Sequence, residues 1–284
     1  MSKKAIAVSA DSTCDLSPEL LNAYGIETLP LYAVLEGTAY KDGVELTPDD
    51  LYATVEKTGK IGSTAAINVD EYLTFFTRLR ETHDTVIHFV ISSEMSSCYQ
   101  NACIAAEEVG GIYIIDSRNL STGIGLLVLR ACELAQKDMA AEVIVSSVQE
   151  MAGRVDATFV PESLEYLKMG GRCSAAAALS ASLLRIKPCI QVREGKMVVG
   201  KKYTGNMENV LMKYVKDRLA NLEDVDLSRV FITHSGMTDP TLVDKVTDAV
   251  LSIAPFENVH HTRAGCTVSM HCGPNTLGVL FCKK

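Results

Sequence analysis

The sequence lacks the features that would place the chain in a membrane or on a nucleic acid. No apolar run reaches the 18 residues that a membrane-spanning helix needs. No long basic run is present, and the formal net charge is −8, which argues against nucleic-acid binding. The apolar stretch that follows the first lysines is too short for a secretory signal peptide. We therefore expect a cytoplasmic protein with no nucleic-acid partner and at most transient membrane contact.

Signatures of metal sites and of disulfide frameworks are also missing. The nine cysteines are an odd number, are scattered along the chain and include no C-x-x-C pair. The six histidines show neither H-x-x-x-H nor H-E-x-x-H spacing. In a cytoplasmic chain such thiols are expected to be reduced and mostly buried. We expect no metal and no cofactor.

The common catalytic motifs are absent as well. The chain has no G-x-S-x-G elbow, no phosphate-binding G-x-x-x-x-G-K-[ST] loop and no G-x-G-x-x-G after a strand. A hydrolase triad of Ser93, His271 and Asp11 stays open as an alternative, although nothing in their spacing supports it. The sequence therefore favours a binding function over catalysis.

The order of the expected elements predicts two α/β units. Strands and helices alternate up to about residue 155, which predicts a parallel three-layer α/β/α domain over residues 1–155. One of its strands spans 27–35, and Pro30 places that strand at a sheet edge. From Asp156 onward the strands include a tight hairpin at Glu194-Gly195, so residues 156–284 are expected to form a second α/β domain with a mixed sheet.

Polar side chains gather directly after three of the expected strands. These clusters are 11–15, 92–97 and 116–117, and we expect them to meet at one edge of the sheet, where open α/β sheets place ligands. Loop hydroxyls such as those of Thr64, Ser93 and Ser96 suit the binding of an anion or a carboxyl group. The alternatives are that the serines only cap the next helix, and that His271, in a polar turn, is structural.

The stretch from 161 to 188 combines a glycine break with a small-residue helix. A short amphipathic helix is expected to end at Gly170-Gly171, and Arg172 follows directly. A second helix, expected over 174–186, begins with four alanines, which allow the close approach of a long thin ligand. Ordinary helix packing beside a solvated arginine is the alternative.

Together these segments resemble the DegV family, whose characterised members are bacterial fatty-acid-binding proteins with the EDD fold. In some members the protein is the lipid-carrying subunit of a fatty acid kinase. The matching segments occur in the family's order and span nearly the whole chain. They are Asp11–Leu16, Tyr40–Gly43, Ser63-Thr64, Ile91–Ala102, Ile115–Ser117, Leu164–Ser174, Leu183–Pro188 and His271–Pro274.

The resemblance implies a non-catalytic protein that holds one long-chain fatty acid in a tunnel between two α/β domains. It implies that the carboxyl end meets Thr64, Ser93 or Ser96, and His271, with Arg172 nearby. The candidates for the tunnel wall are Ala175–Ala178, Leu179, Leu183 and Leu184. The resemblance also implies an ATP-dependent fatty acid kinase subunit as the partner in kinase-coupled members.

The chain departs from the family's pattern at positions that bear on kinase coupling. Tyr203-Thr204-Gly205 stands where coupled members carry a basic run, and Ala65 replaces the serine that often follows the threonine. We therefore predict that lipid binding is retained while phosphorylation by a generic fatty acid kinase subunit is weak. Two other classes stay open, an enzyme (an acyl-ester hydrolase or a ketose-kinase-like domain) and a lipid-responsive regulator.

Overall fold

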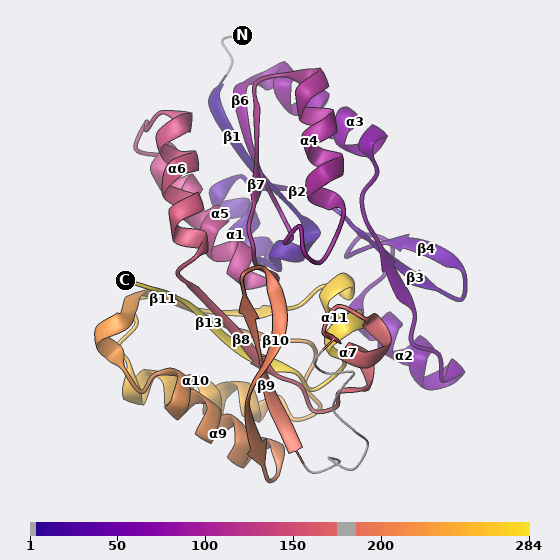
Figure 1. Ribbon diagram of the computed structural model, residues 1–284, viewed down its shortest axis with the longest axis vertical. Helices are drawn as coiled ribbons and strands as arrows, with labels where there is room; N and C mark the ends of the chain where they lie inside the picture. Colours follow the sequence, from indigo (N-terminus) through magenta and orange to yellow (C-terminus); the bar gives the residue numbers. More distant parts are fainter. Residues whose placement is uncertain (1–3, 175–185) are drawn as a thin grey trace.

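The first half of the chain builds a four-stranded parallel sheet. The computed structural model describes residues 4–174 and 186–284. The strands of this sheet, in spatial order, are β2 (Glu27–Leu29), β1 (Lys4–Asp11), β6 (His83–Val90) and β7 (Ile112–Asp116). Helices lie on both faces (Figure 1): α3 (Val69–Thr82) and α4 (Cys98–Val109) on one, α1 (Pro18–Tyr24), α5 (Thr122–Ala135) and α6 (Ala141–Ala152) on the other. The predicted parallel three-layer arrangement is confirmed.

The second half builds a six-stranded mixed sheet. In spatial order its strands are β10 (Lys196–Thr204), β9 (Ile186–Arg193), β8 (Val155–Val160), β13 (Leu277–Lys283), β11 (Val225–His234) and β12 (Val259–Arg263). The β11–β12 pair is parallel, and the other neighbours are antiparallel. Helices α9 (Met207–Arg218) and α10 (Thr241–Ile253) pack against its strands (Figure 1). The predicted mixed sheet is confirmed.

A third, small sheet corrects the expectation of one strand over residues 27–35. The expected strand is interrupted at Pro30, because proline has no N–H and a fixed φ and so breaks the hydrogen-bond ladder of the sheet. β2 stays at the edge of the parallel sheet, and the residues after Pro30 form another sheet. That sheet holds β4 (Thr38–Lys41), β3 (Tyr32–Leu35) and β5 (Ser63–Ala65), and α2 (Pro48–Thr58) follows β4 in the chain.

Helix α5 lies between the two large sheets. Its side chains are buried on nearly every face, as expected for a helix covered on all sides. It contacts β1 of the first sheet and both β8 and β13 of the second. The largest apolar cluster runs accordingly from Phe89 in the first sheet to Phe231 and Leu280 in the second. The two sheets divide near residue 155, and the division of the chain into domains 1–155 and 156–284 stays a prediction.

Other expectations have mixed outcomes. Within residues 4–174 and 186–284, no helix is long and apolar enough to cross a membrane. Eight of the nine cysteines are buried, and Cys103 is half-buried, as predicted. The expected alanine-rich helix falls on residues 175–185, which lie outside the described residues, and so do the wall candidates within it. Ile186, expected at the end of that helix, instead begins β9.

Candidate functional site

Helix α7 (Glu165–Gly170) ends with two glycines that have different roles. Gly171 adopts the left-handed conformation, with φ of 69°, which ends the helix as predicted. Gly170 is needed for close approach: a Cβ there would lie 2.1 Å from Nδ1 of His271. Arg172 follows, exposed, and its Nη1 donates to the Gly170 carbonyl at 2.9 Å. The predicted glycine break thus makes room for a histidine from a distant part of the chain.

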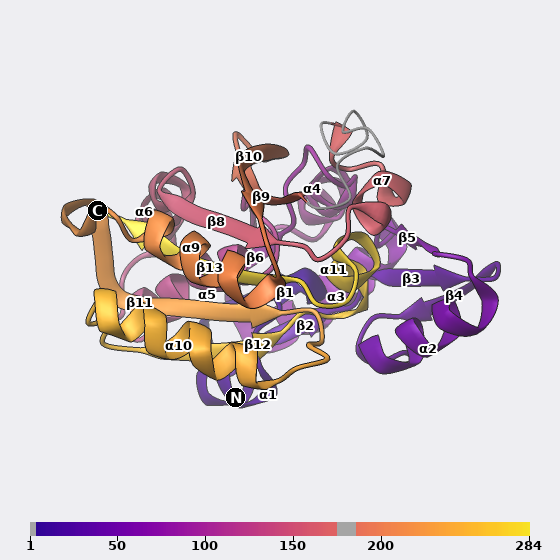
Figure 2. The same cartoon turned by 90° about the horizontal axis from the view of Figure 1, so that it is seen from below.

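His271 is carried by α11 (Cys266–Cys272), a short helix beside α7, β3 and β5 (Figure 2). Two buried aspartates from the first half hold its N-terminus. Asp42 accepts from the backbone N–H groups of Cys266 at 2.6 Å and Thr267 at 3.1 Å. Asp15 accepts from the N–H of Gly265 at 2.8 Å. These bonds satisfy amide groups that a helix start leaves open, so the motifs around Asp15 and Asp42 fix the position of His271.

Two buried aspartates, one at the end of β1 and one just beyond it, have raised pKa values. Burial raises the pKa of the Asp15 carboxyl to about 8, although the N–H of Gly265 and the hydroxyl of Ser121 donate to it. Burial likewise raises the pKa of Asp11 to about 6. Asp11 accepts from the N–H of Ile91 at 2.8 Å, which ties β1 to the end of β6. The polar clusters meet at this sheet edge, as predicted. Asp11 and Asp15 accept hydrogen bonds there from backbone N–H groups of the protein itself.

Thr64 and His271 form the centre of the site. Oγ1 of Thr64 lies 2.8 Å from Nε2 of His271. Burial, together with the positive charge of Arg172, lowers the pKa of His271 to about 4, so the ring is neutral at physiological pH. Nδ1 is buried and has no hydrogen-bond partner among the described residues. Since buried N–H groups are rarely left unpaired, we assign the proton to Nε2, which leaves the Thr64 hydroxyl free to donate.

A cavity of about 140 Å³ opens beside this pair. Its polar lining comes from Thr64, Ser96, Ser97, Arg172, Thr267 and His271, and its apolar lining includes Leu31, Ile91, Met95, Leu120, Met197 and Val268. The hydroxyl of Thr267 is buried without a hydrogen-bond partner among the described residues. Thr64, Ser96, Arg172 and His271, all predicted from the sequence, are therefore brought together.

A second, smaller cavity of about 30 Å³ adjoins the first and reaches the core of the second sheet. It shares Leu120, Val268 and Cys272 with the first cavity and extends to Phe159 and Leu280, and the surface it exposes is mostly apolar. The walls thus change from polar at Thr64 and His271 to apolar between the two sheets. Such a gradient suits an amphipathic ligand with one polar end.

Ser93 lies elsewhere. Its hydroxyl donates to Oδ2 of Asp116 at 2.6 Å, its N–H faces Oδ1 of the same carboxylate, and it does not line the cavity. Ser96 lines the cavity and also accepts from the N–H of Cys98 at 3.3 Å, so it both caps the next helix and faces the site. The triad alternative is not supported, because Ser93 pairs with Asp116 and His271 with Thr64.

Sequence reasoning missed three parts of this site. Asp15 and Asp42 lie in motifs that give no sign of their role, because their capping of α11 depends on contacts more than 200 positions apart. Thr267 carried no motif. The packing of Gly170 on His271 had a signal in the paired glycines, but one glycine is enough to end a helix.

Comparisons with known proteins identify related chains. A family model described as "Uncharacterised protein, DegV family" matches residues 5–284. A DegV domain-containing protein from Caldanaerobacter subterraneus is 31% identical over 282 residues, covering 98% of this chain and 99% of that protein. One from Deinococcus radiodurans is 32% identical over 278 residues, covering 97% of each. A Thermus thermophilus DegV family structure, described by its fatty acid binding, is similar at a TM-score of 0.91 and 28% identity, covering 99% of this chain and 100% of that one.

Proposed function

This chain belongs to the DegV family, and from that membership we propose that it is a non-catalytic carrier of one long-chain fatty acid. The observation that carries the proposal is the cavity with a polar end at Thr64, Ser96 and His271 and an apolar continuation between the sheets. The description of the Thermus thermophilus structure as fatty-acid-binding supports the same reading.

Burial of the acyl chain supplies most of the binding free energy in this proposal. Each buried methylene contributes about 0.8 kcal/mol, so about 15 methylenes offer about 12 kcal/mol before ordering costs. The cavity of about 140 Å³ is smaller than the roughly 300 Å³ lower limit of typical ligand sites. A long chain therefore requires wall side chains to move, and Met95 and Met197 are the flexible ones.

The carboxylate is proposed to lie at Thr64 and His271. The Thr64 hydroxyl donates to it, while neutral His271 holds that hydroxyl through Nε2. Ser96 adds a second hydroxyl, and Arg172 adds a positive charge at the rim. Thr64 and Ser96 belong to the proposed domain 1–155, whereas Arg172 and His271 belong to the proposed domain 156–284, so the ligand bridges the two.

Coupling to an ATP-dependent fatty acid kinase subunit is the finer part of the proposal. Tyr203 is buried, and its hydroxyl donates to Asp217 at 2.9 Å. Lys201 pairs with the same carboxylate at 2.7 Å. Lys202 is exposed on the same strand, so we expect it to be the main cation that β10 offers a phosphate-bearing partner. Weak phosphorylation by a generic kinase subunit follows.

We also propose a cytoplasmic location, since scattered cysteines suit a reducing compartment.

The proposal is tested by mass spectrometry of an organic extract from the purified protein. We expect a fatty acid at close to one mole per mole of protein. Delipidation should lower the melting temperature, and adding the same acid should restore it, because a ligand that binds only the folded state stabilises it. A protein that yields no lipid and does not respond to added fatty acid would contradict the proposal.

A further inference from the structure

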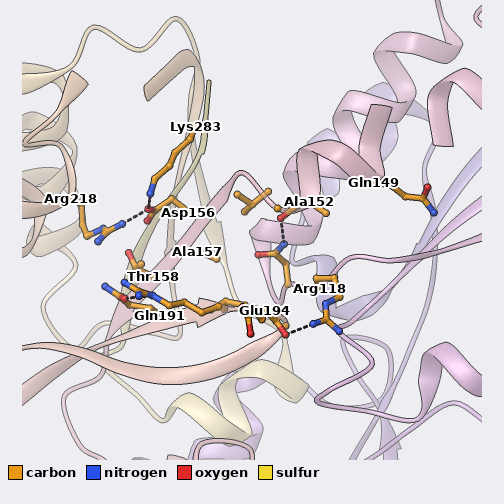
Figure 3. A pocket seen from close by; sticks show the side chains of 16 residues that line it. Arg118, Gln149, Ala152, Asp156, Ala157, Thr158, Gln191, Glu194, Arg218 and Lys283 are labelled. Atoms are coloured by element: carbon orange, nitrogen blue, oxygen red, sulfur yellow. Dashed lines mark hydrogen bonds and ion pairs between the residues drawn. The ribbon is translucent and has the colours of Figure 1, made fainter. Parts of the chain in front are cut away.

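Another cavity, of about 700 Å³, is lined by β9 and the turn that follows it, whereas Met197 of β10 lines the cavity at Thr64 and His271. The end of α6 forms one wall, and β8, β9 and Arg218 of α9 form the other. Figure 3 shows Arg218 and Lys283 converging on Asp156, with Gln149 and Arg118 across the cavity. It shares no lining residue with the cavity at Thr64 and His271, so it is a separate site.

The lining of this cavity is cationic in a chain whose net charge is −8. Its cations are Arg118, Arg193, Arg218 and Lys283, and its carboxylates are Asp156 and Glu194. Both Arg218 and Lys283 bind the same oxygen, Oδ2 of Asp156, with Lys283 at 3.1 Å. One carboxylate thus partners two cations, while Arg118 pairs with Glu94 and Asp116, which do not line the cavity.

Arg193 is held in position with its outer nitrogens free. Its Nε donates to Oε1 of Gln191 at 3.0 Å, and Gln191 is buried. Gln191 itself packs against Gly200, where a Cβ would lie 2.7 Å from the Gln191 amide. Within the described part of the chain, Arg193 forms no ion pair. The fork of its two Nη groups is therefore available for bidentate recognition of an oxyanion.

Two polar atoms of the opposite wall lack partners. Among the described residues, neither Nε of Arg218 nor Oδ1 of Asp156 has a hydrogen-bond partner, and both atoms are buried. An unpaired buried polar group is costly. Because both atoms are buried, a ligand in the cavity can pair with them only when the Arg218–Asp156 pair turns toward it. An oxyanion that binds Arg218 would provide the acceptor for Nε, and a hydroxyl on the same ligand would provide the donor for Oδ1.

We propose that this cavity binds the phosphomonoester of a small polar alcohol. The phosphate, close to doubly negative at neutral pH, matches the excess positive charge at Arg193, Arg218 and Lys283. The exposed amide of Gln149 is available to the polar remainder. No aromatic side chain lines the cavity, so it offers no surface for stacking a nucleotide base. The volume lies within the range of small-molecule sites.

Calorimetric titration of the full chain with glucose 6-phosphate, inorganic phosphate, glucose and succinate tests this proposal. We expect one saturable site for glucose 6-phosphate, weaker binding of inorganic phosphate, and none for glucose. Arg193→Gln should weaken glucose 6-phosphate binding at least tenfold. Arg193→Lys should weaken it nearly as much, because lysine cannot form the bidentate contact. Lys202→Gln removes the same charge from the neighbouring strand outside the cavity and should change affinity less than twofold.

Four outcomes overturn the proposal. These are no saturable binding of either phosphate, equal losses in Arg193→Gln and Lys202→Gln, tighter binding of succinate than of glucose 6-phosphate, and displacement of glucose 6-phosphate by palmitate. The last would place the phosphate in the cavity at Thr64 and His271. The first three outcomes do not depend on whether the cavity at Thr64 and His271 binds a fatty acid. The displacement by palmitate does depend on it, so it is measured in a separate titration.

Discussion

Oγ1 of Thr64 lies 2.8 Å from Nε2 of His271, although 207 positions separate the two residues. Thr64 lies on β5 of the small antiparallel sheet. His271 lies on α11, whose N-terminus is bound by aspartate side chains of the first half. The contact between Thr64 and His271 therefore depends on the correct packing of both segments. If the carboxylate of a ligand binds there, small changes on either side of this contact have measurable effects on affinity.

Replacing Thr64 with valine keeps the volume and removes the hydroxyl. We expect affinity for a fluorescent fatty acid to fall by about 1–3 kcal/mol, the cost of losing one buried hydrogen bond. Thr38→Val is the matched control, because Thr38 is an exposed threonine of the same sheet. Equal affinity of the Thr64→Val variant and the control would remove Thr64 from the head-group site.

The two serines that follow β6 give a paired test. The hydroxyl of Ser93 is held by Asp116, whereas Ser96 lines the cavity. Ser96→Ala should weaken fatty acid binding by about 1 kcal/mol, and Ser93→Ala should leave it unchanged. The same titration measures both variants, and a larger loss in Ser93→Ala would reverse the assignment.

Gly170→Ala tests the packing of α7 against the histidine. The added Cβ would lie 2.1 Å from Nδ1 of His271, so the ring must move and its contact with Thr64 is broken. We expect an affinity loss as large as that of His271→Ala. Gly153→Ala is the control, since a Cβ there has no neighbour closer than 3.9 Å. Unchanged binding in Gly170→Ala would show that the ring position is unimportant.

The raised pKa of Asp15 predicts how stability depends on pH. Its carboxyl titrates near 3.8 when unfolded and near 8 when folded. The folded state therefore holds the proton more tightly, and the free energy of unfolding falls as pH rises across that interval. Burial lowers the pKa of His271 to about 4, so this ring takes up a proton on unfolding near pH 6.5 and gives a slope of the opposite sign. The contribution of Asp15 is therefore measured as a difference from a variant that lacks its carboxyl.

Urea unfolding at several pH values between 6.5 and 8 measures this effect. We expect the wild-type midpoint to fall, as pH rises across the interval, relative to the midpoint of the Asp15→Asn variant, which cannot ionise at this position. Asparagine tolerates the left-handed backbone of this position. Equal slopes in the two proteins would show that Asp15 is ionised in the folded protein.

Kinase coupling is tested on Lys202. We expect weak acyl phosphate formation by a generic fatty acid kinase subunit with the lipid-loaded wild type. Lys202→Arg should increase turnover, because arginine makes the bidentate phosphate contact that lysine cannot. Lys137→Arg, an exposed lysine at the far end of α5, serves as the control. Robust wild-type turnover with no gain in Lys202→Arg would contradict the expectation. Tyr203→Arg is unsuitable, because Tyr203 is buried.

Much of the fold was predictable because the signals are local. Apolar runs, helix caps and glycine breaks follow from short stretches of sequence, and strand ends in a parallel sheet meet by topology. Pro30 predicts a sheet edge. In the structure it is also the point where the chain passes from the parallel sheet to the small antiparallel sheet. The direction of Ser93 was not predictable, because its bond to Asp116 depends on how two strand ends are placed in space. Capping of α11 by Asp42, 224 positions away, has no local signal.

In the proposed carrier, the carboxylate of the fatty acid lies at Thr64 and His271. The most direct measurement is the ¹³C NMR spectrum of carboxyl-labelled palmitate added to delipidated protein. We expect one bound resonance that saturates at one equivalent, shifts in Thr64→Val and His271→Ala, and stays in place in Ser93→Ala. A bound resonance that is the same in all four proteins, or no bound resonance at all, would contradict the claim.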